Sequence, residues 1–273
     1  MKKLLSLVAV LSIVMVATSC KKDSEKDIEK ELYPSSDYRL SADGKVLEKW
    51  LNTETTSVDM QKDIKLREVT SIAQEAFKEH KKLISIVISD KVEHIRYGVF
   101  EKCPQLTNVH IPNSVTTLGA MAFANCYSLA SITIPSSIQS IGYQSFYDSG
   151  LKTVTIKDGV KNIEKEAFSR CLGLTNIDFP NTLTHIGTHA FYSCINLPSI
   201  NLPKSIESIS SNAFTSCSAL TIVTINATTP PVIEKTTFSE YTVKRINVPA
   251  NSVDTYKKAE NWVEFTNKIV ALP

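Results

Sequence analysis

Phenylalanine recurs at an almost constant interval along most of the chain, and this regularity limits the possible folds more than any other feature. Successive members of the series are 22 to 24 residues apart. A fixed period of this length is typical of repeat proteins, in which each unit buries its apolar side only by stacking on its neighbours. We therefore expect a stack of coils. The series is Phe77, Phe100, Phe123, Phe146, Phe168, Phe191, Phe214 and Phe238.

Other apolar columns keep the same phase and predict a strand in each repeat. In the repeat that runs from Leu106 to Cys126, Val109 and Ile111 lie two positions apart. Alternate residues of a strand share a face, so both should point into the core while the residue between them faces solvent. A proline, which has no N–H for a ladder, closes the strand in five repeats. These prolines are Pro112, Pro135, Pro180, Pro203 and Pro249.

A second extended segment and a helical turn complete each predicted coil. The second segment, as in residues 115–118, carries one inward residue per repeat, for example Leu118. The helical turn is predicted around pairs such as Ala122 and Phe123, where the small residue lets backbone segments approach each other. At about 4.8 Å per stacked strand, eight coils would build a core roughly 38 Å long.

The combined pattern, L-x-x-I-x-I-P, then V-x-x-I-G, then A-F-x-x-C, resembles the BspA-like leucine-rich repeat of bacterial surface proteins. Eight phased copies cover residues 64–249. The resemblance implies an α/β repeat solenoid: a right-handed coil stack with parallel β-strands, about eight repeats of 22–24 residues, capped at both ends. One repeat departs from the pattern, because Ser145 replaces alanine before Phe146 and the segment before Leu151 is one residue short.

Both ends break the repeat, as terminal repeats do when they cover an exposed core. Residues 33–63 are predicted to form an N-terminal hairpin cap, since Asp43–Gly44 between apolar flanks is a hairpin signal. Trp50 should lie over the first coil. Residues 250–273 form the predicted C-terminal cap, with a helical segment over 252–266 whose aromatic residues cover the last coil. These are Tyr256, Trp262 and Phe265.

The first residues have the layout of an export signal. Two lysines, an apolar run too short to span a membrane and a small-residue site predict a signal peptide over residues 1–19. The cysteine that follows resembles the lipobox of bacterial lipoproteins, which implies lipid attachment at Cys20; an ordinary signal peptide with an incidental cysteine is the alternative. Residues 20–32 are densely charged and predict a flexible tether.

The charged tether also resembles the surface-export signal of Bacteroidetes lipoproteins. This resemblance implies an outer-membrane protein that is anchored by lipid and faces the cell exterior, with a periplasmic location as the alternative. The only membrane contact would be the anchor. Once Lys2 and Lys3 are removed with the leader, 28 basic and 28 acidic residues remain. A neutral chain lacks the electrostatic footprint of a nucleic-acid-binding protein, so we expect no nucleic-acid partner.

Five cysteines predict a structural thiol ladder. Each lies three residues after a repeat phenylalanine, and Ser149 takes this position in the shortened repeat. Exported proteins usually form disulfides. Stacked equivalent positions about 4.8 Å apart are, however, wider than the roughly 3.8 Å between Cβ atoms that a disulfide prefers. We therefore expect buried thiols that act as small hydrophobic side chains. They are Cys103, Cys126, Cys171, Cys194 and Cys217.

No motif in the sequence predicts an enzyme. His185 and His189 are four residues apart and could ligate zinc on a helical face, but they fall on positions held by surface residues in other repeats, without an acidic third ligand in phase. The glycines form no phosphate-binding cluster, and neither a nucleophile elbow nor a pair of carboxylates in a common phase is present. We expect no catalytic residue, cofactor or metal.

The function implied by the resemblance is protein–protein interaction, through the family's association with adhesion to host matrix and to other bacteria. The alternative is a glycan-binding lipoprotein that serves nutrient capture. Sugar platforms need aromatic rings presented outward, and both tryptophans belong to the caps, although Tyr143, Tyr147 and Tyr192 could form an aromatic ridge. A lysine cluster could attract acidic glycans or be a solvated, charge-balanced ridge. It comprises Lys152, Lys157, Lys161 and Lys165.

The candidate ligand face is the row of residues between the inward strand positions. Its short polar side chains lose little rotamer entropy when a partner orders them, and solenoids bind through extended faces. Thr, Ser and Asn also suit any exposed strand, which is the alternative explanation. If the row binds a protein, we expect hydrogen bonds and weak salt dependence. It comprises His110, Thr133, Thr155, Asp178, Asn201 and Thr224.

Overall fold

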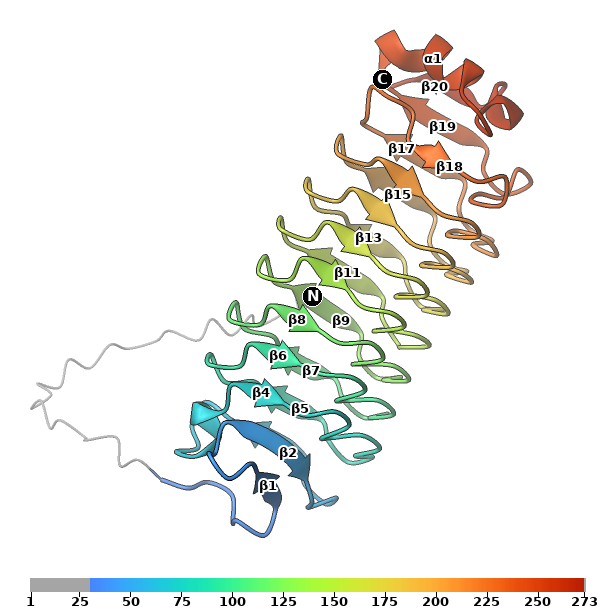
Figure 1. The fold of residues 1–273 in the computed structure, drawn as a ribbon. Coiled ribbons are helices and arrows are strands. Elements are labelled where there is room, and N and C mark those ends of the chain that lie inside the picture. The colour runs from blue at the N-terminus through green and yellow to red at the C-terminus, as the bar shows by residue number, and fades with distance from the viewer. Residues whose placement is uncertain (1–29, 273) are drawn as a thin grey trace, which may run out of the picture.

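The computed structural model of the protein describes residues 30–272. They form an elongated stack of coils along one axis (Figure 1). One side of the stack is a single sheet, here called the continuous sheet, in which β1 pairs antiparallel with β2 and all further pairs are parallel. Its strands, in spatial order, are β1 (Tyr38–Leu40), β2 (Val46–Trp50), β4 (Ser71–Ile72), β6 (His94–Ile95), β8 (Thr117–Leu118), β10 (Ser140–Ile141), β12 (Asn162–Ile163), β14 (His185–Ile186), β16 (Ser208–Ile209) and β18 (Val232–Ile233).

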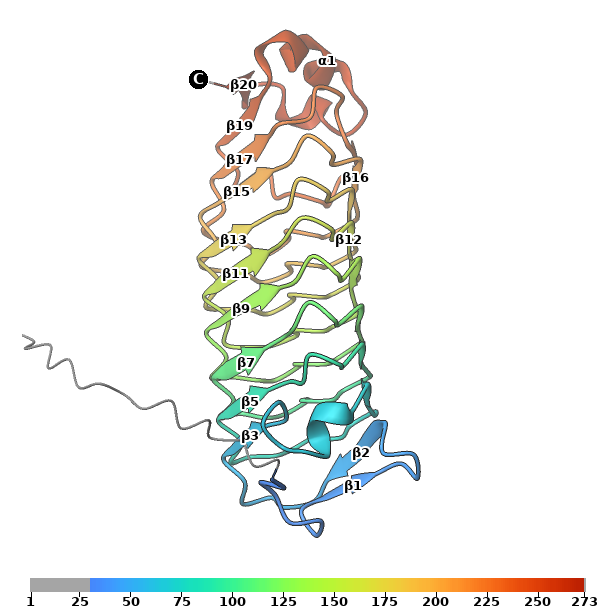
Figure 2. The same cartoon turned by 90° about the vertical axis from the view of Figure 1, so that its left-hand side faces the viewer.

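The opposite side is divided into three separate parallel sheets, together called the segmented sheet (Figure 2). The first contains β3 (Ser57–Asp59), β5 (Ser85–Val87) and β7 (Asn108–His110). The second contains β9 (Ser131–Ile134), β11 (Thr153–Ile156) and β13 (Asn176–Asp178). The third contains β15 (Ser199–Leu202), β17 (Ile222–Ile225), β19 (Arg245–Val248) and β20 (Ile269–Ala271).

The predicted solenoid is confirmed, and its strands pair one repeat apart. Val154 lies beside Ile132 in the β11–β9 pair, and Ile163 lies beside Ile141 in the β12–β10 pair. All four side chains are buried. The stack has about ten turns, against the eight predicted repeats. The difference arises because β2, β3 and β20, which belong to the terminal regions, extend the stack with strands of their own.

The helical turn predicted around each phenylalanine is wrong. Met121 and Asn125, which flank Phe123, have positive φ angles of 56° and 59°. The Phe123 N–H therefore points along the stack and donates to the carbonyl of Ser145 in the next coil at 2.7 Å. An α-helix would keep this bond within its own segment. Among residues 30–272 the one α-helix is α1 (Val253–Lys258), and the 3₁₀ helices are Leu66–Glu68, Ala250–Ser252 and Val263–Phe265.

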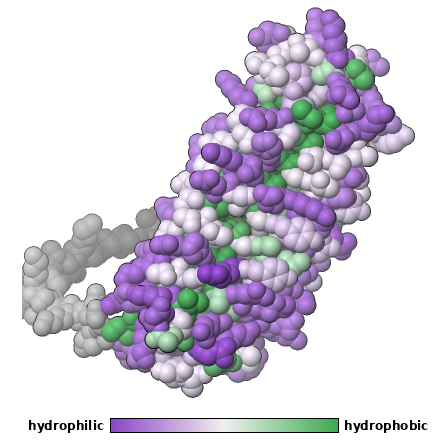
Figure 3. Space-filling model, in the orientation of Figure 1, coloured by the Kyte–Doolittle hydropathy of each residue, from purple (hydrophilic) through white to green (hydrophobic). Residues whose placement is uncertain are grey.

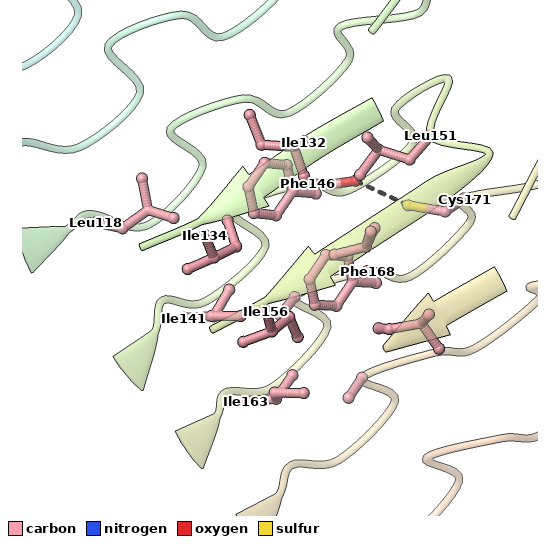
Figure 4. Packing of buried hydrophobic residues seen from close by; sticks show 14 of the residues in the cluster. Leu118, Ile132, Ile134, Ile141, Phe146, Leu151, Ile156, Ile163, Phe168 and Cys171 are labelled. Atoms are coloured by element: carbon pink, nitrogen blue, oxygen red, sulfur yellow. Dashed lines mark hydrogen bonds between the residues drawn. The ribbon is translucent and has the colours of Figure 1, made fainter. Parts of the chain in front are cut away.

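The repeat phenylalanines form one aromatic column under both sheets. From Phe77 to Phe238, neighbouring ring centroids are 5.0 to 5.4 Å apart and the planes differ by at most 20°. Phe146 and Phe168 are two of these rings in Figure 4. Trp50 extends the column at one end, 5.5 Å from Phe77, and Trp262 lies 6.1 Å from Phe238 at the other. The core thus runs without interruption between the ends.

The C-terminal residues terminate the stack by satisfying carbonyl groups that have no following coil. Tyr256 Oη donates to the carbonyl of Ala227 at 2.8 Å, and Trp262 Nε1 donates to that of Pro231 at 2.8 Å. Tyr256, Trp262 and Phe265 are all buried. An exposed last coil would instead leave these polar groups and its apolar edge facing solvent. β20, which pairs parallel with β19, was not expected from the sequence.

At the other end, Tyr38–Leu40 and Val46–Trp50 form a hairpin whose turn contains Gly44 at φ 69°. Asp63, a buried carboxylate, accepts the N–H of Leu32 at 2.6 Å, so the last residues of the predicted tether contact the body of the protein. The predicted signal peptide and Cys20 lie outside the described residues. No helix within residues 30–272 combines the length and the hydrophobicity needed to cross a bilayer.

Candidate functional site

The six predicted face residues, here called the polar row, lie on the outer surface of the segmented sheet. Each comes from a different strand, from His110 in β7 to Thr224 in β17, and each is exposed or half-buried. Thr155 pairs in register with Thr133 on one side and with Asp178 on the other. Asn201 pairs with Thr224. The structure therefore brings the row together in three groups that follow the three parts of the sheet. Whether the row binds a ligand stays a prediction.

Hydrogen bonds between amide and hydroxyl side chains order the row toward its C-terminal end. Asn226 Nδ2 donates to Asn201 Oδ1 at 2.8 Å, and Asn247 Nδ2 donates to Thr224 Oγ1 at 3.1 Å. Asp178 is the only carboxylate in the row, and Asn176 Nδ2 donates to its Oδ1 at 3.3 Å. A surface of short donors and acceptors with a single charge is suited to hydrogen bonding more than to ion pairing.

The two interruptions of the segmented sheet have different origins. In an intact pair, the residue just before the strand donates its N–H to the preceding coil, as Lys152 does to the Ala130 carbonyl at 2.8 Å. At the β13–β15 interruption this position is Pro198, which has no N–H to donate. Pro198 is therefore the sequence signal for this interruption, although it is not one of the five prolines that predict strand ends.

The β7–β9 interruption has no such signal. Ala130 has an N–H, but no hydrogen bond joins it to Thr107, the partner expected from the repeat, although the structure describes both residues. A cleft of about 400 Å³ opens there. Its lining includes His110 and Thr133 of the polar row, together with Asn108, Ser131 and Lys157. Figure 2 shows the wider spacing between β7 and β9.

The predicted cysteine column is buried, and the structure adds a partner that the sequence did not indicate. Each thiol donates to the carbonyl of the repeat phenylalanine in the preceding coil, at 3.1 to 3.3 Å. Figure 4 shows the bond from Cys171 to Phe146. The free, buried thiols are Cys103, Cys126, Cys171, Cys194 and Cys217. Burial raises the pKa of Cys103 and Cys171 to about 12, which disfavours the reactive thiolate.

Two non-cysteine residues complete this column. Ser149 Oγ lies 3.3 Å from the Cys171 sulfur. His80 occupies the same place in the first coil, where its Nε2 lies 3.1 Å from the carbonyl of Trp50, the residue that precedes the phenylalanines in the aromatic column. Burial lowers the pKa of His80. The position of His80, three residues after Phe77, was the sequence signal for its membership of the column.

The other candidate residues are not brought into one site. His185 Nε2 lies 3.7 Å from Glu207, whereas the ring of His189 packs edge-on against Tyr192 at 5.4 Å. In the described part of the chain, no three His, Cys, Asp or Glu side chains are grouped closely enough to hold a metal ion. In the lysine cluster, Lys165 lies 5.9 Å from the ring centroid of Tyr143 and 3.5 Å from Glu166.

Comparison with known proteins identifies this architecture. A model of the BspA type leucine rich repeat region matches residues 52–173 and 141–259 in six copies. A leucine-rich repeat protein from Eubacterium ventriosum superposes with a TM-score of 0.60 at 24% identity, covering 66% of this chain and 50% of that one. The leucine rich repeat protein of T. pallidum gives 0.52 at 24% identity, covering 75% and 84%.

These likenesses to solved structures show the fold. The chain spans half the length of the Eubacterium protein. A search of curated proteins gives no match.

Proposed function

Because the chain belongs to the BspA-type leucine-rich repeat family, we propose that it is a non-enzymatic cell-surface lipoprotein whose solenoid binds other proteins, most directly in adhesion to host or bacterial surface proteins. Leucine-rich repeat proteins generally mediate protein interactions. The observation that carries the proposal is the polar row, which presents exposed or half-buried short side chains in sequence along one side of a rigid stack.

The chemistry of the row supports a protein partner. Paired strands fix the backbone beneath Thr133, Thr155 and Asp178, so binding would order little beyond short side chains. Hydroxyl and amide groups can donate to and accept from a partner's backbone. With one carboxylate in the row, ion pairing would contribute little, and the affinity should change only weakly between low and physiological salt.

The proposed location is the outer membrane, with the solenoid facing the cell exterior on a lipid attached to Cys20. Its support is the sequence pattern that ends at Cys20, which precedes the described residues. Incorporation of labelled palmitate into the full chain, and its loss in Cys20→Ala, is the expected result. Protease added to whole cells should also remove the solenoid. An unlabelled wild-type chain would contradict the anchor, and a solenoid that protease does not reach would contradict the outward orientation.

Glycan capture is the second candidate, and one contact favours it. Tyr143 is 39% exposed, and the Lys165 ammonium lies 5.9 Å from its ring centroid. A ring with a neighbouring cation could stack on a sugar and attract an acidic substituent. A glycan-array signal that disappears in Tyr143→Ala but persists in variants of the polar row would favour this function.

The deciding experiment is to measure binding of the chain to a panel of purified matrix proteins. The test variant replaces Thr155, Asp178 and Asn201 by lysine. The control variant replaces Thr117, Asn162 and Ser208, which lie on the continuous sheet, by lysine. We expect the test variant to lose binding while retaining the wild-type circular dichroism spectrum, and the control to bind normally. Unchanged affinity in the test variant would contradict the proposal.

A further inference from the structure

The cleft between β7 and β9 leaves the facing edges of these two strands unpaired. Within each part of the segmented sheet, neighbouring strands are paired. In the next pair along the stack, the N–H groups of Lys152 and Thr153 both donate to the Ala130 carbonyl, at 2.8 and 3.3 Å. The equivalent N–H groups of Ala130 and Ser131 make no hydrogen bond to Thr107 across the cleft, although all these residues are described. Two strand edges thus face each other across an open space of about 400 Å³.

The cleft also uncovers part of the core. Val109 is an inward residue of β7, yet it is only half-buried. Its equivalents in intact pairs, Ile86 and Val154, are each 1% exposed. Unpaired backbone groups beside an uncovered apolar side chain are the features that an added β-strand would satisfy, through main-chain hydrogen bonds and alternating side chains.

The charge at the cleft has one sign. Lys157 lines the end at which the strands finish, and its ammonium has no ion pair within residues 30–272. The cleft lining contains no carboxylate and no aromatic ring other than the imidazole of His110. A lysine without a counterion favours an anionic group, whereas the lack of a flat aromatic platform does not favour a sugar.

We propose that this cleft binds an extended segment of a partner protein as an added strand between β7 and β9. Small apolar side chains of that segment cover Val109, and an acidic side chain or a terminal carboxylate lies next to Lys157. This proposal rests on the proposed function, because it names the form in which a protein partner engages the polar row at His110 and Thr133. The pairing restores the ladder that the β7–β9 interruption lacks.

The test uses a random dodecapeptide display library selected against the full chain. The most enriched sequence is then synthesised with ordinary and with N-methylated backbone amides. We expect enriched peptides that alternate small apolar and polar residues and carry an acidic residue. We also expect affinity to fall at least about tenfold on N-methylation, because N-methylation removes main-chain donors.

Two matched variants separate the cleft from the general surface. Lys157→Glu should lower the affinity for the selected peptide by about tenfold, since it reverses the charge beside the acidic group. Lys152→Glu, at the other end of the same strand segment and outside the cleft, should bind it normally. Bound peptide should slow hydrogen exchange at the amides of Ala130 and Ser131.

Several results would overturn the proposal: no enriched sequence, an affinity that N-methylation leaves unchanged, or equal effects of the two lysine substitutions. An oligosaccharide that protects the same amides when no peptide does would assign the cleft to a sugar instead. Failure of the proposed function is a separate result. A matrix protein that binds through the polar row but leaves the Ala130 and Ser131 amides exchanging as in the free chain would refute the inference alone.

Discussion

The two sides of the solenoid are built from the same coils, yet one is a continuous sheet and the other is interrupted twice. Glycines on the continuous side show how closely its coils approach. A Cβ on Gly119 would lie 2.6 Å from the carbonyl carbon of Arg96, and one on Gly187 would lie 2.7 Å from the backbone nitrogen of Lys165. Such positions exclude every other residue without displacement of a neighbouring coil.

The segmented side has equally close approaches around β11, where a Cβ on Gly150 or Gly159 would lie 1.9 or 2.0 Å from a carbonyl oxygen of the preceding coil. It has no glycine at β7 or β9, and there the strands separate while the aromatic column beneath them stays stacked. The rings of Phe100 and Phe123, on either side of the β7–β9 interruption, are 5.0 Å apart. Figure 3 shows the side of the molecule that carries the continuous sheet. Most of this surface is hydrophilic, and hydrophobic residues follow the stack axis along its middle. The continuous side therefore keeps its strands paired along the whole stack, whereas the segmented side opens at β7–β9 and presents a varied surface there.

The largest expected effect comes from removing a ring that both sides share. Phe168 is fully buried, with neighbouring rings 5.2 Å away on both sides. Phe168→Ala should lower the free energy of unfolding by about 3–5 kcal/mol, measured by urea denaturation. Tyr127→Ala, at a side chain that is 57% exposed, is the control and should change it by less than about 0.5 kcal/mol. Similar losses in the two variants would contradict the role of the aromatic column.

A proline pair tests the difference between an intact and an interrupted position. Lys152→Pro removes an N–H that donates to Ala130 at 2.8 Å, and should cost about 1–3 kcal/mol of unfolding free energy. Ala130→Pro changes the equivalent position at the β7–β9 interruption, where this bond is missing from the described structure, and should cost less than about 0.5 kcal/mol. Equal costs would show that β7 and β9 are paired in solution.

The continuous side can be interrupted deliberately through its glycines. Gly119→Ala places a Cβ within 2.8 Å of three backbone atoms of the neighbouring coil, and should destabilise the protein by about 1–3 kcal/mol. Gly173→Ala is the control, because its nearest atom would be 3.3 Å away. Thermal unfolding of both variants measures the difference. A control as unstable as Gly119→Ala would refute the spacing argument.

The smallest effect is expected at the N-terminal end of the thiol column. His80 Nδ1 is buried without a hydrogen-bond partner among the described residues, and burial with some repulsion from Lys49 lowers the pKa of the imidazole. The fold therefore favours neutral His80. The contribution of neutral His80 to the free energy of unfolding should be fully present above the unfolded-state pKa of about 6.5. It should decrease as the pH falls from there to the lowered folded-state pKa.

Replacement by the residue of the other repeats isolates this contribution. The slope of unfolding free energy against pH below about 6.5 should be smaller in His80→Cys than in the wild type. Denaturation curves at a series of pH values measure it. An identical slope in the two proteins would assign the acid sensitivity to other groups.

Sequence periodicity predicted the features that depend on alternation and phase. The inward columns and the cysteine column follow from spacing alone, because equivalent positions must superpose in a repeat stack. The position of Trp50 over Phe77 follows instead from the need to cover the first coil, since Trp50 lies outside the period of 22 to 24 residues. The turn around each phenylalanine could not be predicted this way. Residues such as Met121 and Glu166 adopt positive φ although nothing in their side chains favours it, and inter-coil hydrogen bonds maintain this conformation.

The interruptions show the same limit within the candidate site. Pro198 marks the β13–β15 interruption in the sequence, because a missing donor is a property of the residue itself. At β7–β9 the equivalent residue is Ala130, which gives no sequence signal for an interruption. Val109 and Ile132 also match the repeat pattern there. The separation of these strands is a property of how neighbouring coils pack. The polar row was therefore predictable residue by residue, while the cleft that divides it was not.

We propose that the segmented side, which is open at β7–β9, takes part in binding, whereas the continuous side maintains the stack. Residue-resolved hydrogen exchange tests it most directly. In the free chain, the Ala130 and Ser131 amides should exchange much faster than those of Lys152 and Thr153, and a bound matrix protein should slow exchange on the segmented side alone. Equal protection of the two pairs in the free chain, or slowing confined to the continuous sheet on binding, would contradict the account.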